Sequence, residues 1–132
     1  MKNLLFALSA LAVLFTGCSK DDDDYNNTNS ELAGKWEATS NYELKNGTWQ
    51  PASIFYDEGL ICEFTNNGKV IMYDYGVKDS EGSYSYNPTS KELVMFNLVC
   101  EISLLNESTL QIIGLGFDDD RMTDKVVFRR IN

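Results

Sequence analysis

Short apolar segments alternate with polar turn clusters along most of the chain, and this pattern predicts strands. From residue 32 onward, β-branched and aromatic runs are separated by clusters of Asn, Gly, Pro and Asp. Such runs, bounded by turn residues, are typical of strands in all-β domains. Eight segments fit the pattern: 35–44, 60–65, 69–77, 82–87, 92–96, 98–105, 109–117 and 125–131. No helical period lies between them, so the sequence predicts an antiparallel meander, closed as a barrel or folded as a sandwich.

Turn residues predict part of the strand register. Asn67-Gly68 is a strong signal for a two-residue hairpin loop, because both positions of that loop take positive φ. Side chains alternate between the two sides of a strand, so this loop fixes which residues share a face. The predicted inner face consists of Leu60, Cys62, Phe64, Ile71, Tyr73 and Tyr75. Beyond residue 87 the turn chemistry leaves the register open.

Four tyrosines come together in this register. A second hairpin, turning through residues 76–82, would pair Tyr75 with Tyr84 and Tyr73 with Tyr86, and would leave Asp74 outside. In one interpretation these are core pairs, since cross-strand aromatic pairs stabilise a hairpin. In the other, the four rings line a cavity that holds an apolar or sugar-like ligand.

The first seventeen residues form a separate pattern. Met1–Asn3 carries one positive charge, and Leu4–Thr16 is almost entirely apolar. A short basic start, an apolar stretch and then small residues are typical of a secretory signal peptide. A helix that spans a bilayer needs about 20 apolar residues, so this stretch is too short for one. We therefore expect residues 1–17 to be removed.

Phe15-Thr16-Gly17-Cys18 resembles the lipobox of bacterial lipoproteins, in which the chain is cut before the cysteine and acylated there. That family prefers Leu at the position of Phe15. The resemblance implies that Cys18 is the lipid anchor and that the membrane contact is made by acyl chains. Each buried methylene contributes about 0.8 kcal/mol, so two or three chains hold a protein stably on a membrane.

Residues 18–31 are polar and predict a lipidated acidic tether. Its beginning looks like the acidic export signal of surface lipoproteins in some Gram-negative anaerobes, and consists of Ser19, Lys20, Asp21, Asp22, Asp23 and Asp24. The resemblance implies an outer-membrane location facing the cell exterior, and periplasm-facing is the alternative. Repulsion among like charges would also keep such a tether extended. The remaining residues, 32–132, make one domain.

Charge and residue types exclude several classes of function. The chain has a net charge of −9, which becomes −10 without Lys2, so we expect no binding to nucleic acid. It contains no histidine, which removes Ser-His-Asp catalysis and the usual zinc ligand. We predict no enzyme, no catalytic residues, no cofactor and no metal. A hydrolase with paired carboxylates would need a deep acidic cleft.

Two cysteines remain after Cys18. Cys62 and Cys100 would lie in an oxidising compartment, where disulfides form and persist. A bridge between them would stabilise the fold by about 4 kcal/mol in the chain-entropy model. Two buried free thiols are the alternative.

Three short motifs mark the ends and an early turn of this domain. Gly34-x-Trp36 stands at the start of the first predicted strand, an F-x-x-x-G turn follows at 64–68, and Arg129 and Arg130 lie on the last strand. Together they resemble the lipocalins, and more closely the small bacterial lipocalin-like domains that follow lipoprotein signals. The resemblance implies an eight-stranded β-barrel with Trp36 at its floor and one of the two arginines stacked on the Trp36 ring. Such a contact is worth about 0.5–2 kcal/mol.

These observations favour a lipid-anchored, lipocalin-like monomer that binds a small apolar or amphipathic ligand at the outer membrane. The alternative is an accessory surface lipoprotein whose barrel is packed solid and whose exterior binds a protein or glycan partner. Cavity volume separates the two, because a ligand site needs roughly 300 Å³ or more.

Overall fold

Strands make up almost all of the regular structure in the described part of the chain. A computed structural model describes residues 31–116 and 121–132. The strands are β1 (Gly34–Lys45), β2 (Thr48–Pro51), β3 (Leu60–Phe64), β4 (Lys69–Asp74), β5 (Val77–Asn87), β6 (Glu92–Met95), β7 (Leu98–Leu105), β8 (Thr109–Ile113) and β9 (Asp124–Arg130). A single turn of 3₁₀ helix, Arg121–Thr123, precedes β9.

The predicted targeting segments lie outside the described residues. They are the signal peptide (1–17), the lipidation residue Cys18 and the export signal, which consists of Ser19, Lys20, Asp21, Asp22, Asp23 and Asp24. Their assignment therefore stays a prediction from the sequence.

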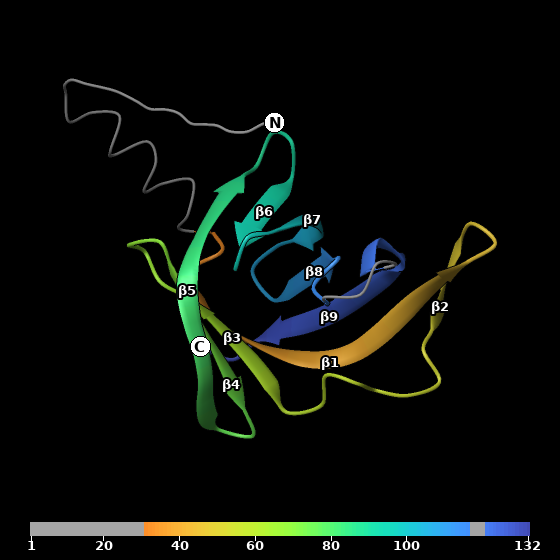
Figure 1. The fold of residues 1–132 in the computed structure, drawn as a ribbon, viewed down its shortest axis with the longest axis horizontal. Coiled ribbons are helices and arrows are strands. Elements are labelled where there is room, and N and C mark those ends of the chain that lie inside the picture. The colour runs from red at the N-terminus through yellow and green to blue at the C-terminus, as the bar shows by residue number, and fades with distance from the viewer. Residues whose placement is uncertain (1–30, 117–120) are drawn as a thin grey trace.

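The sheet closes on itself. Each strand from β3 to β9 pairs antiparallel with the next, and β1 pairs with both β3 and β9. This makes an up-and-down barrel of eight strands, the architecture of lipocalins. The predicted all-β barrel is confirmed. Figure 1 shows β1 continuing past the barrel wall, where its far half forms a hairpin with the extra strand β2.

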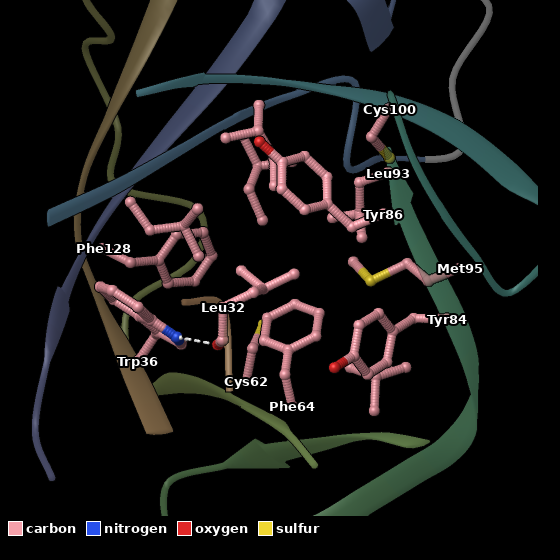
Figure 2. Packing of buried hydrophobic residues seen from close by; sticks show 14 of the residues in the cluster. Leu32, Trp36, Cys62, Phe64, Tyr84, Tyr86, Leu93, Met95, Cys100 and Phe128 are labelled. Carbon is pink, nitrogen blue, oxygen red and sulfur yellow. Dashed lines mark hydrogen bonds between the residues drawn. The ribbon is translucent and has the colours of Figure 1, made fainter. Parts of the chain in front are cut away.

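The interior is filled at one end of the barrel. Trp36, Phe64 and Phe128 are almost fully buried, and Leu32, from the segment before β1, lies among them. Figure 2 shows these side chains packed together, with Tyr84 and Met95 on the far side of Phe64. A core this dense is sensitive to the loss of even one large side chain.

The first predicted hairpin is shifted by one residue. Phe64 pairs with Val70 and Cys62 with Met72, so a three-residue loop, 66–68, replaces the predicted two-residue loop. The Lys69 amide donates to Thr65 Oγ1 (3.0 Å), and Gly68 takes a φ of +87°. This is the three-residue loop that ends in a left-handed residue. The shift turns every β4 side chain to the opposite face from the one predicted.

The second hairpin also turns elsewhere. Tyr75 (φ +51°) and Gly76 (φ +83°) form a two-residue loop between Asp74 and Val77. The predicted loop, 76–82, is instead mostly strand, and Asp79 is the extra residue of a bulge within it. The predicted pairs Tyr75–Tyr84 and Tyr73–Tyr86 are therefore wrong.

Beyond residue 87 the structure resolves the open register. Leu93 and Met95 on β6 are buried, and they pair with Cys100 and Leu98 on β7. The inner face of β6 is therefore the Leu93 face.

Candidate functional site

The two ends of the barrel differ, and the closed end carries the predicted floor residues. Trp36 and Arg130 are directly paired across β1 and β9. The Arg130 guanidinium carbon lies 4.2 Å from the centre of the Trp36 ring, which is the predicted cation–π contact. Trp36 Nε1 donates to the Leu32 carbonyl (2.9 Å) and ties the chain before β1 across the barrel end.

Arg130 is also the hub of a hydrogen-bond network. Its guanidinium donates to the carbonyls of Ala33 (2.7 Å), Glu31 (2.9 Å) and Glu107 (2.7 Å). Arg129 instead points away from Trp36 and donates to Glu37 (2.8 Å) in an exposed ion pair. Of the two candidate arginines, Arg130 stacks on the tryptophan and Arg129 does not.

Gly34 is required by both conformation and space. Its φ of +130° is one that side-chain-bearing residues rarely adopt. A Cβ at this position would lie 2.5 Å from Nη1 of Arg130. The glycine therefore lets the guanidinium reach across the end of β1 to the Trp36 ring.

Two of the four predicted cavity tyrosines face inward. Tyr84 and Tyr86 are buried, and burial raises the pKa of the Tyr86 phenol. The Tyr84 hydroxyl donates to the Thr65 carbonyl (2.7 Å), and its ring meets Phe64 edge-on with centroids 5.0 Å apart. Both are core residues, and neither lines the cavities described below.

The other two do not point into the core. Tyr73 borders one of the cavities described below, whereas Tyr75 lines neither of them, which corrects the prediction for Tyr75. The Tyr73 hydroxyl donates to Glu63 (2.8 Å) on the outer wall, and this hydrogen bond raises the pKa of the phenol. Tyr75 is 68% exposed at its turn. The physical reason is the one-residue shift, which keeps the hydroxyl of Tyr73 out of an apolar interior where it would have to find a partner.

Substituting the tyrosines individually tests these positions. We expect Tyr84→Phe to lower the free energy of unfolding by about 1 kcal/mol, because a buried hydrogen bond is lost. The matched Tyr75→Phe should change it by less than about 0.5 kcal/mol, since an exposed hydroxyl is removed. Urea unfolding followed by circular dichroism measures both, and equal effects would contradict the assignment.

Cys62 and Cys100 are both buried and free in the structure, which is the second of the two alternatives that the sequence left open. The Cys62 thiol lies 3.3 Å from the Met72 sulfur, and the Cys100 thiol lies 3.3 Å from the Gly114 carbonyl. Each side chain therefore has a neighbour other than the second cysteine. Burial raises the pKa of both thiols, that of Cys100 to about 11.

The opposite end of the barrel is open and contains a cavity of about 450 Å³. It lies where β3 begins, β4 ends and the β6–β7 turn passes, at the end of β3 opposite Phe64. Its apolar lining is Leu60, Met72, Met95, Phe96, Leu98 and Leu115. The volume is within the range of small-molecule sites. We call this the mouth cavity.

A second hollow of about 640 Å³ adjoins the mouth cavity on the side of β1 and β9. Tyr56, Leu60, Met72 and Leu115 line both, so the two are lobes of one depression. The amide of Asn41 donates to Asp57 (2.7 Å), which fixes the segment between β2 and β3 over this end.

Carboxylates surround the mouth cavity. Asp57, Glu58, Asp74 and Asp79 all line it, and its lining includes no lysine or arginine. Asp74 pairs with Leu60 across β3 and β4 and so faces inward, which corrects its predicted place on the outer face. Of the residues that line this site, the sequence analysis named only Tyr73 as a cavity residue, because the others come from turns and from strand ends whose register was shifted.

Within residues 31–116 and 121–132, no group of three His, Cys, Asp or Glu side chains could hold a metal ion. No helix in that part of the chain is long and apolar enough to cross a membrane. The candidate site is therefore a cavity with apolar residues at its base, the floor, and carboxylates around its opening, the acidic lip.

Comparison with solved structures finds proteins of similar fold. No protein-family model and no curated protein matches this sequence. Among solved structures, a lipocalin-like protein from Bacteroides uniformis is similar, with 15% sequence identity and a TM-score of 0.46. The match covers 76% of this chain and 99% of that one. The lipocalin-like architecture itself follows from the strand order and barrel closure.

Proposed function

We propose that this chain is a lipid-anchored binding protein, not an enzyme, that holds a small apolar or amphipathic molecule in the mouth cavity at the outer membrane. The observation that carries the proposal is the cavity of about 450 Å³ with an apolar floor. The alternative function assumed a barrel packed solid throughout, and only the end of the interior around Trp36 is packed in that way.

The anchoring part of the proposal is supported by the sequence of residues 1–24. The apolar stretch, Cys18 and the acidic run match the order expected of a surface lipoprotein. Acyl chains on Cys18 would keep the binding domain beside the membrane, where apolar molecules concentrate.

Replacing Cys18 tests the anchor. We expect Cys18→Ser to abolish the mature acylated form, because the lipid is attached through the sulfur and the new terminal amine of this residue. Metabolic labelling with a fatty acid and intact mass measurement should show acyl chains on the unchanged protein only. A protein that still begins at Met1 and carries no lipid in its host would contradict the proposal.

A cavity-filling variant tests ligand binding. Native mass spectrometry of the protein purified from its host should show the added mass of a co-purified small molecule. Leu115→Trp should remove that mass, because Leu115 lines both lobes of the depression. The matched control Leu104→Trp places the same ring on an exposed strand position and should leave the mass in place.

The outcome separates the two functions considered for this fold. Loss of the added mass in Leu115→Trp alone supports binding in the mouth cavity. Equal retention in both variants would contradict a site there, and would favour a partner bound on the exterior.

A further inference from the structure

We propose that the mouth cavity selects an organic cation, an ammonium or guanidinium group carried on a small apolar body. This inference rests on the proposed function and names the chemistry of its ligand. It is carried by the arrangement of charge around an apolar floor.

The charge around the mouth cavity has a single sign. Four carboxylates line the mouth cavity, and no cationic side chain lines it. Asp74 and Asp79 make no ion pair or side-chain hydrogen bond with any described residue. Nearby carboxylates create a negative potential in a hollow with low-dielectric walls, which attracts cations and repels anions.

The neighbouring cations are engaged elsewhere. Lys78, beside Asp79, pairs with Glu81 (2.5 Å) on the wall of the barrel. Lys125 lies over the Trp49 ring (4.6 Å), and Arg121 donates to the carbonyls of Val99 and Gly114. A bound cation would therefore meet carboxylates that no lysine or arginine already neutralises.

Local geometry places two of the carboxylates beside the apolar floor. Asp74 lies opposite Leu60 on the inner face, so its carboxylate is at the edge of that floor. Asp79 is the extra residue of the β5 bulge, and a bulge changes the direction in which a side chain points. A ligand whose apolar part covers Leu60 and Met72 would bring its charged end to these two carboxylates.

An organic cation fits this lining better than a metal ion does. The described residues include no cluster of three potential ligands, so these carboxylates are spread around the lip and do not converge. Tyr56, 68% exposed, lines both lobes and offers an aromatic face to an ammonium group. The flexible Met72 and Met95 suit an apolar body of variable shape.

Three probes with one apolar body test the charge preference: phenylpropylammonium, phenylpropanol and phenylpropanoate. The full chain is reconstituted in phosphatidylcholine nanodiscs, and titration calorimetry against empty nanodiscs corrects for partition into lipid. We expect the ammonium probe to bind about tenfold more tightly than the alcohol, and the carboxylate probe to bind most weakly.

Charge-removing variants locate the effect. Asp74→Asn with Asp79→Asn should lower the affinity for the ammonium probe by about tenfold and leave that for the alcohol unchanged. The matched control, Glu92→Gln with Glu101→Gln, removes the same charge from an exposed pair on the outer wall and should change neither.

A measurement on the unchanged protein guards against a misfolded variant. High ionic strength should lower the affinity for the ammonium probe, because salt screens the carboxylates, and should leave the affinity for the alcohol unchanged. Equal affinity for all three probes, with no salt effect, would overturn the inference while the binding function stands. No binding of any probe would overturn both.

Discussion

Trp36→Ala is expected to lower the free energy of unfolding by about 3–5 kcal/mol, the usual loss for a fully buried large aromatic side chain. Trp36 has no exposed surface, hydrogen-bonds the Leu32 carbonyl and stacks under Arg130. Truncation would leave a cavity, an unpaired carbonyl and a guanidinium without its ring. Urea and thermal unfolding measure the change.

Two variants make the test specific. Trp49→Ala removes the other tryptophan, which lies half-buried on β2 outside the closed barrel, and should cost less than about 1.5 kcal/mol. Trp36→Phe keeps a ring but loses the indole N–H, so its loss in the free energy of unfolding should lie between those of Trp49→Ala and Trp36→Ala. A loss below about 1 kcal/mol for Trp36→Ala would show that the barrel does not depend on this end.

The segments that became strands were predictable from their composition. Eight of the nine strands overlap the runs of β-branched and aromatic residues, because such side chains fit a pleated, half-buried surface. The ninth, β2, is four residues long and includes a proline. Its signal was nevertheless present: Asn46-Gly47 forms the kind of two-residue hairpin loop that was predicted only at Asn67-Gly68.

The register was not predictable, and the reason is chemical. Asn46-Gly47 and Asn67-Gly68 are the same dipeptide, yet the second lies in a longer loop. There the Thr65 hydroxyl accepts a hydrogen bond from the Lys69 amide and donates to Asn67. A side chain outside the dipeptide thus favours the longer loop, and the single added residue changes which face β4 buries.

The one-residue register error changed which residues were predicted to line the mouth cavity. The shift placed Met72 and Asp74 on the inner face, so the cavity is lined by methionines and carboxylates, and of the four predicted tyrosines only Tyr73 borders it. The closed end, by contrast, was anticipated by resemblance, because Arg130 approaches both Gly34 and Trp36 within a few residues of the strand ends. A prediction that depends on a local motif holds when the register is wrong by one residue, whereas a prediction of which residues line a cavity does not.

Cys62 and Cys100 are expected to react with a thiol reagent at pH 8 at least about a hundredfold more slowly in the folded protein than in denaturant. The thiolate is the reactive form, and raising the Cys100 pKa from 9.0 to about 11 lowers its fraction roughly a hundredfold. Burial, the main cause of that rise, raises the pKa of Cys62 further and also excludes the reagent.

Colorimetric titration without reductant measures both states. Two thiols should appear in denaturant, which would be impossible if they were bridged, and Cys62→Ala or Cys100→Ala should each remove one. The proposed acylation of Cys18 would keep that residue out of the count. Fast reaction of the folded protein would contradict the burial of the two thiols, and no reaction in denaturant would show a disulfide.

The same pKa shifts contribute to the loss of stability in alkali. Well below pH 9 both thiols are protonated in the folded and unfolded chains, so they add no pH dependence. Between pH 9 and about 11 the unfolded chain loses protons that the folded one keeps, so stability falls as pH rises. The slope for each thiol approaches about 1.4 kcal/mol per pH unit. Replacing Cys100 with Ala should reduce this alkaline loss, and an unchanged slope would show that other groups cause it.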